Sequence, residues 1–141
     1  MKNQIIIHKK IQPFSKKILV SSDKSISIRC ILLSAIATGK SKLFNLLDSE
    51  DVINSLSAIK KMGVKYIKKK SHLEIFGVGI NGFQAKKKII LNAGNSGTLA
   101  RCILGLSSAT NKSFKLIGDP SLSKRDFSRV IKPLNLFGLK I

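Results

Sequence analysis

The chain contains an internal repeat. Residues 29–41, RCILLSAIATGKS, recur as residues 101–113, RCILGLSSATNKS, 72 positions further along. A second pair, KMGVK at 61–65 and LFGLK at 136–140, is offset by 75 positions, so the second copy carries an insertion of three residues. A period of this length indicates one supersecondary unit built twice. This repeat constrains the fold more than composition does.

The hydrophobic pattern predicts the same order of elements in both copies, a βαβαββ unit of an α/β fold. For the first copy we expect strands at 18–20, 42–47, 64–68 and 72–76 and helices at 24–38 and 51–62, after a separate strand at 4–8. For the second we expect strands at 88–91 and 113–117, helices at 96–110 and 125–137, and a strand from Leu139. The helix at 24–38 is apolar on nearly all sides, which predicts burial between layers. The second copy stops before its closing hairpin, so we expect the N-terminal part of a longer protein.

Small polar residues precede the first helix of each copy, at 21–25 and at 95–98. Gly94 and Gly97 let the backbone approach a ligand, and Asn95, Ser96 and Thr98 are suited to cap the helix that follows. Such a helix start binds anions readily. An ordinary strand-loop-helix connection explains the same residues. Because such a helix start occurs in both copies, the sequence favours two positive helix ends that face one cleft.

Arg29 and Arg101 each lie in an otherwise uncharged helical stretch. A guanidinium group is costly to bury unless a negative group pairs with it. The chain has only seven acidic residues against 26 basic ones, so an anionic ligand is a natural partner. Ser25, four residues before Arg29, shares its helix face and adds a hydroxyl suited to a carboxylate or phosphate. The alternative is an ion pair of the arginine with Asp48 or Asp119.

Composition separates two classes of partner. The formal net charge of +19 suggests nucleic acid, but 22 of the 26 basic residues are lysines. They lie mainly in clusters with few aromatic residues between them, which favours a solvated surface. No apolar run is long enough to span a membrane, and the N-terminus lacks the pattern of a secretory signal, so we expect a cytoplasmic protein. Cys30 and Cys102 are expected as buried, reduced thiols. No metal site and no cofactor are expected.

Four motifs, in order along nearly the whole chain, carry a family resemblance: DKSISIR at 23–29, NLLDSED at 45–51, NAGNSGT at 92–98 and GDPSLSKR at 118–125. Together they resemble the 5-enolpyruvylshikimate-3-phosphate synthases, also called 3-phosphoshikimate 1-carboxyvinyltransferases. The resemblance implies transfer of the enolpyruvyl group from phosphoenolpyruvate to shikimate 3-phosphate, with release of phosphate, on the pathway to chorismate and the aromatic amino acids. It implies small-molecule substrates, no nucleic-acid or membrane partner, and a monomer at full length.

The resemblance also implies an inverted α/β barrel architecture, with two domains of three βαβαββ units each and the substrates between them. Residues 1–20 would supply the first strand and hinge segment of the domain that the C-terminal part completes. Residues 21–141 would form the first two units of the other domain, the second of them truncated.

The resemblance assigns the roles of the family's residues, one by one, to the matching positions of this sequence. By resemblance, Lys24 touches both substrates and is the catalytic residue of this part of the enzyme. The residues implied for shikimate 3-phosphate are Lys24, Ser25 and Arg29, and those implied for phosphoenolpyruvate are Lys24, Asn95, Gly97 and Arg125. The Gly97 N–H and Arg125 would clamp the phosphate, and Arg101 would support the loop.

Two departures from the family pattern stand out. Ser21 and Ser22 replace the usual proline or glycine, and Ile28 replaces a histidine or asparagine. The family's proton-transferring aspartate and glutamate lie in regions that this chain lacks, so we expect no turnover from these residues alone. Three alternatives remain: the related UDP-N-acetylglucosamine enolpyruvyl transferase, which has asparagine where Ser25 stands, a basic nucleic-acid-binding module, and a non-functional truncated product.

Overall fold

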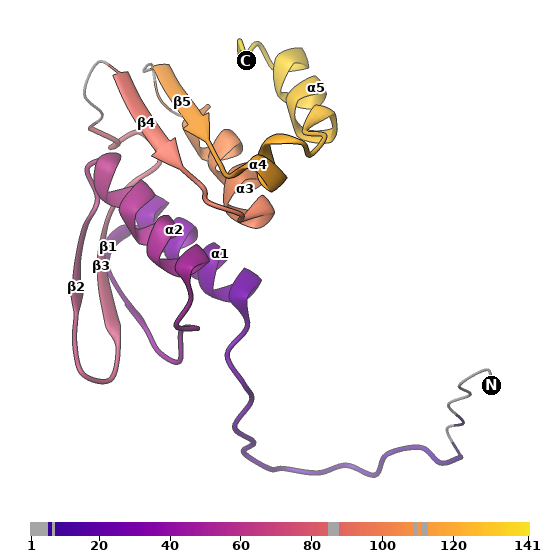
Figure 1. Cartoon of the computed structure of the whole chain (residues 1–141). Coiled ribbons are helices and arrows are strands. Elements are labelled where there is room, and N and C mark those ends of the chain that lie inside the picture. The colour runs from indigo at the N-terminus through magenta and orange to yellow at the C-terminus, as the bar shows by residue number, and fades with distance from the viewer. Residues whose placement is uncertain (1–5, 7, 85–87, 109, 111–112) are drawn as a thin grey trace.

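The computed structural model describes residues 6, 8–84, 88–108, 110 and 113–141. An extended N-terminal segment leads away from a body that begins at Lys24 (Figure 1). The strand predicted at 18–20 is wrong: Ile18, Leu19 and Val20 are exposed and in no strand, because no neighbouring strand pairs with them. Their contact with the body is a hydrogen bond that Asn45 Nδ2 donates to Val20 O, at 3.2 Å. Residues 4, 5 and 7 of the strand predicted at 4–8 lie outside the described residues.

Helix α1 (Lys24–Ile36) begins where the sequence predicts. The Asp23 side chain caps it by accepting a hydrogen bond from Ile26 N at 2.7 Å. The chain then passes directly into β1 (Thr38–Leu43), so the strand predicted at 42–47 begins four residues earlier. The helix predicted at 24–38 ends at Ile36 because Ala37 is already extended. Gly39 lies inside β1 opposite Gly77, with a φ of 84°.

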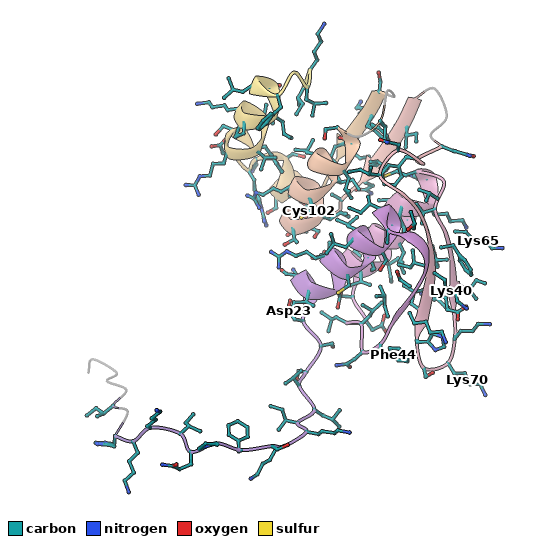
Figure 2. The ribbon with its side chains drawn as sticks, turned by 180° about the vertical axis from the view of Figure 1, so that it is seen from behind. Asp23, Lys40, Phe44, Lys65, Lys70 and Cys102 are labelled. Carbon is teal, nitrogen blue, oxygen red and sulfur yellow. The ribbon has the colours of Figure 1, made fainter. Side chains whose placement is uncertain are left out.

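The first copy continues with α2 (Glu50–Lys61) and the predicted hairpin of β2 (Lys65–Lys68) and β3 (Leu73–Val78). The three strands form an antiparallel sheet in the order β1-β3-β2. Lys40, Lys65 and Lys70 extend from its open side, away from the helices (Figure 2). On the other side α1 packs against β3 and α2, and Ile31, Ile59 and Ile75 are fully buried there.

In the second copy, β4 (Lys88–Asn92) and β5 (Ser113–Ile117) form a parallel pair with Leu91 opposite Leu116. Helix α3 (Gly97–Ser107) connects them and packs on α1, and it ends three residues before the predicted position. Both predicted strands and the predicted helix are therefore confirmed. The combination of helices with a three-stranded and a two-stranded sheet agrees with the predicted α/β class.

The end of the chain differs from the prediction. Asp119 caps a short helix, α4 (Pro120–Ser123), with Pro120 in its first turn. The helix predicted at 125–137 is α5 (Ser128–Leu136), and it starts late because Asp126 accepts the Ser128 N–H. The strand predicted from Leu139 is absent from the described residues. Leu139 N instead donates to Leu134 O past Gly138, whose φ is 89°, and this closes α5.

Helix α1 is not buried on all sides, contrary to the prediction. Ile28, Ile31 and Leu32 face the core, whereas Ile26 is 60% exposed and Leu33 is 62% exposed. The neighbours β3, α2 and α3 cover only part of its circumference. The two cysteines are free thiols but only half-buried, which corrects the expectation of burial. No helix in the described part of the chain is long and apolar enough to cross a membrane.

Candidate anion-binding site

The loop between β4 and α3 is held by its own side chains. Asn92 Oδ1 accepts a hydrogen bond from Gly94 N at 2.9 Å, and Gly94 has a φ of 55°. Ser96 caps α3 by accepting from Leu99 N at 3.2 Å. The Gly97 and Thr98 amides of the first helical turn have no hydrogen-bond acceptor within the described residues. These N–H groups and the helix dipole make the start of α3 electropositive.

The starts of α1 and α3 lie next to each other. The hydroxyl oxygens of Ser25 and Thr98 are 3.3 Å apart, although 73 positions separate the two residues. The two repeat-related helix starts are therefore adjacent, whereas the shared cleft that they would face stays a prediction. A groove of about 830 Å³ lies elsewhere, between α3, β5 and α5, where Ile103, Phe114 and Phe127 line it.

Two guanidinium groups converge on Gly97. Arg125 Nη2 donates to Asn95 Oδ1 at 3.1 Å, and Arg101 Nη1 donates to Gly97 O at 3.4 Å. A Cβ atom at Gly97 would lie 2.8 Å from Nη1 of Arg101 and 2.8 Å from Nη1 of Arg125. Arg101 also lies over the ring of Phe127, 5.5 Å from its centroid. Two like charges beside a helix start favour a negative group between them.

Asp119 is a further member of this cluster that the sequence did not reveal as such. Its Oδ2 accepts from Asn95 Nδ2 at 2.6 Å, and its Oδ1 accepts from Leu122 N at 2.6 Å. The Asn95 hydrogen bond, followed by that of Leu122, holds the pKa of the Asp119 carboxyl below its usual value. In the sequence, Asp119 was a candidate only for an ion pair with an arginine. Its bond to Asn95 spans 24 positions and has no local signal.

Lys24 is held at the start of α2. Its ammonium nitrogen lies 2.9 Å from Oδ2 of Asp51, which is buried and has no partner in hydrogen-bond geometry in the described chain. The contact is therefore an ion pair without a well-aligned hydrogen bond. The side chain of Lys24 is 53% exposed, so solvent screens much of this attraction. Lys24 thus joins α1 to α2 and keeps part of its surface open.

Arg29 lies apart from these contacts. It is exposed on the same face of α1 as Ile26 and Leu33, and it makes no hydrogen bond or ion pair with any described residue. The alternative of an ion pair with Asp48 or Asp119 is therefore wrong. The structure brings Asn95, Gly97 and Arg125 together and places Ser25 against the same loop, whereas Lys24 contacts Asp51 and Arg29 stays free.

No three histidine, cysteine or carboxylate residues in the described ranges are grouped so as to hold a metal ion. The fold and the site define an α/β protein whose arginines and free amides suit an anionic ligand. The family model of EPSP synthase (3-phosphoshikimate 1-carboxyvinyltransferase) matches residues 8–141. The chain therefore belongs to the EPSP synthase family.

Individual relatives agree with this assignment. The chain is 37% identical over 135 residues to the 3-phosphoshikimate 1-carboxyvinyltransferase of Syntrophomonas wolfei, covering 96% of the chain and 31% of that relative. It is 42% identical over 129 residues to that of Streptococcus pyogenes serotype M2, covering 92% and 30%. A solved EPSP synthase from Acinetobacter baumannii superposes with a TM-score of 0.80 at 40% identity, covering 89% of the chain and 28% of that structure. The chain thus spans about 30% of the length of these relatives.

Proposed function

We propose that this sequence is part of an enzyme that transfers the enolpyruvyl group of phosphoenolpyruvate to shikimate 3-phosphate, with release of phosphate. The observation that carries the proposal is the cluster at the start of α3, where Arg125 and Arg101 converge on Gly97. A phosphate group matches this cluster in charge, and its oxygens can accept from both guanidinium groups and from the free amides. Membership of the EPSP synthase family supports this chemistry.

The proposed reaction protonates the phosphoenolpyruvate methylene to a methyl group, and the oxygen of a substrate hydroxyl adds to the resulting cationic carbon as it gives up its own proton. The tetrahedral intermediate then expels phosphate, and its methyl group loses a proton to restore the carbon–carbon double bond of the enolpyruvyl group. In this scheme Arg125 and the Gly97 N–H hold the phosphate of phosphoenolpyruvate, with Asn95 beside them. They orient the phosphate and stabilise its charge as it departs. Ser25 and Arg29 bind shikimate 3-phosphate, and Lys24 lies between the substrates as the catalytic residue. These roles follow the family motifs, position by position.

We further propose that this chain supplies anion-binding groups without the acid-base pair, and therefore binds substrate without turning it over. In the full-length protein, residues 1–20 would belong to one domain and residues 21–141 to the other. Titration calorimetry with shikimate 3-phosphate, followed by phosphoenolpyruvate, tests the binding. Arg29→Ala should abolish shikimate 3-phosphate binding. Tighter binding of UDP-N-acetylglucosamine, or phosphate release by the chain alone, would contradict the proposal.

The full-length protein is proposed to act as a cytoplasmic monomer on small molecules and not on nucleic acid. The free thiols of Cys30 and Cys102 suit a reducing compartment. On the open side of the first sheet, Lys40 pairs with Glu74 at 3.4 Å, and Lys65 lies over the Phe76 ring. A filter-binding assay with single-stranded DNA and RNA should show weak retention that falls steeply with salt and does not depend on Arg29.

A further inference from the structure

Asn95 lies between a carboxylate and a guanidinium group. Its Nδ2 donates to Asp119 at 2.6 Å, and its Oδ1 accepts from Arg125 at 3.1 Å. An ionised carboxylate only accepts hydrogen bonds, and a guanidinium group only donates them. The two partners therefore permit one orientation of the Asn95 amide, and the opposite orientation would break both bonds.

We infer that Asp119 is a positioning residue, which fixes the Asn95 amide so that its oxygen holds Arg125 beside Gly97. The inference rests on the proposed function, in which Arg125 binds a phosphate group. Asp119 does not touch that ligand. It acts through Asn95, and it is itself fixed because its second oxygen accepts from Leu122 N at the start of α4.

The surroundings of Arg125 show why such a device is needed. Arg125 is exposed, and its one hydrogen bond to a described side chain is the bond to Asn95. A second guanidinium group, that of Arg101, approaches the same glycine and repels it. A long side chain in solvent loses considerable rotamer entropy on being held. The Asp119 carboxylate offsets the repulsion with charge and removes the freedom of the amide, so that Arg125 is in place before a ligand arrives.

The role can be separated from the capping role of Asp119 by one nearly isosteric substitution. In Asp119→Asn, the new side chain still offers an oxygen to Leu122 N, so the cap of α4 is kept. Its other atom becomes an NH₂ donor that faces the Asn95 NH₂ group. Asn95 must then turn over and present its own donor to Arg125, which releases the arginine. A second variant, Asn95→Ala, releases Arg125 and leaves Asp119 untouched.

The double variant Asn95→Asp with Asp119→Asn provides the rescue. The amide at position 119 would donate to the carboxylate at position 95, and this carboxylate would accept from Arg125. The bond between positions 95 and 119 is restored with its direction reversed, and Arg125 still donates to position 95. A residue that acts only as a helix cap predicts no such rescue. Asp126→Asn is the matched control, because it removes the same charge one residue from Arg125 at a site bonded to Ser128.

The experiment records the ¹⁵N heteronuclear NOE of the Arg125 Nε–H in the ligand-free, full 141-residue chain. Arg29, which has no partner among the described residues, serves as the internal reference for a free side chain. The NOE of Arg125 should be high in the wild type, fall to the Arg29 level in Asp119→Asn and in Asn95→Ala, and recover in the double variant. It should not change in Asp126→Asn. Unchanged order of Arg125 in both single variants, or no recovery in the double variant, would overturn the inference.

Inorganic phosphate is then titrated into the same samples. Asp119→Asn should weaken phosphate binding by about tenfold, the value of one lost charge-assisted hydrogen bond. If no sample binds phosphate, the proposed function fails, whereas the ligand-free NOE still decides the role of Asp119. If Arg125 loses its order but phosphate binds as in the wild type, Asp119 positions Arg125 as inferred, and the proposed role of Arg125 as the phosphate ligand fails.

Discussion

At Gly97, the absence of a side chain lets Arg101 and Arg125 approach the first turn of α3 together. The limits on this site are steric as well as electrostatic, since any Cβ atom would lie 2.8 Å from a nitrogen of each guanidinium group. Both contacts are to the ends of flexible side chains. A substitution here would therefore displace the arginines and leave the helix in place.

Gly97→Ala should weaken binding of inorganic phosphate by about tenfold, because both guanidinium groups move away from the Gly97 amide. The free energy of unfolding should change by less than about 1 kcal/mol, since alanine is the better helix former. Calorimetry and urea denaturation measure the two quantities. The matched control is Gly105→Ala in the same helix, where a Cβ atom meets nothing within 4 Å. Phosphate binding that is equal in the two variants would refute this steric account.

Stability should decline in acid because of Asp119 and Asp126. Hydrogen bonds from Asn95 and Leu122 lower the pKa of Asp119 from its usual 3.8, and hydrogen bonds from Ser128 lower the pKa of Asp126. A depressed pKa in the folded state gives stability that is present above the unfolded pKa and is lost as the pH falls through the folded pKa. The urea midpoint should therefore drop below about pH 4, and Asp119→Asn should make this drop shallower. A midpoint that rises in acid would contradict the assignment.

At the scale of elements, β3 passes close to the end of α1. A Cβ atom at Gly77 would overlap the carbonyl oxygens of Ser34 and Ala37, which are backbone atoms that cannot turn away. The sequence repeat does not reveal this contact, because it depends on how the first sheet lies against α1. The position requires glycine for space and not for an unusual backbone angle.

Gly77→Ala should lower the free energy of unfolding by about 1–3 kcal/mol, the usual cost of overpacking. Gly105→Ala, at an exposed helical position, should raise it by about 0.5–1 kcal/mol. Urea denaturation of the two variants beside the wild type gives both values. The prediction fails if both alanines shift the midpoint in the same direction.

The sequence predicted interactions between residues close together in the chain and missed those between residues far apart in it. Ser96 was recognisable as a helix cap because its hydroxyl accepts from an amide only three positions away. Leu139 did not form the expected strand, because a strand also needs a hydrogen-bonded neighbour, which sequence patterns do not supply. In the site, the convergence of Asn95 and Arg125 followed from the family motifs. The bond from Asn95 to Asp119 became visible only in the folded chain.

At the scale of the whole molecule, the two repeats differ in the strands that pair with β1 and with its counterpart, β5. β1 pairs with β3 along one edge, whereas β5, its counterpart in the second copy, pairs only with β4 in the described structure. Beside β5 lies the apolar groove that contains Ile103, Phe114 and Phe127. The helix that follows ends in Leu136 and Phe137, both almost fully exposed. Internal symmetry therefore predicts that this edge can accept an antiparallel hairpin, as β1 pairs with the hairpin of β2 and β3.

The polypeptide that follows the matched region in the Acinetobacter baumannii EPSP synthase should supply this hairpin in trans. Co-expressed with the chain, it should form a complex on size-exclusion chromatography, protect the β5 amides from hydrogen exchange and raise the melting temperature. Ile117→Glu places a charge in the groove and should prevent the association. Ile90→Glu, on the neighbouring strand but outside the groove lining, is the control and should leave it intact. Association that tolerates Ile117→Glu, or protection that appears on β1 and not on β5, would show that the hairpin lies elsewhere.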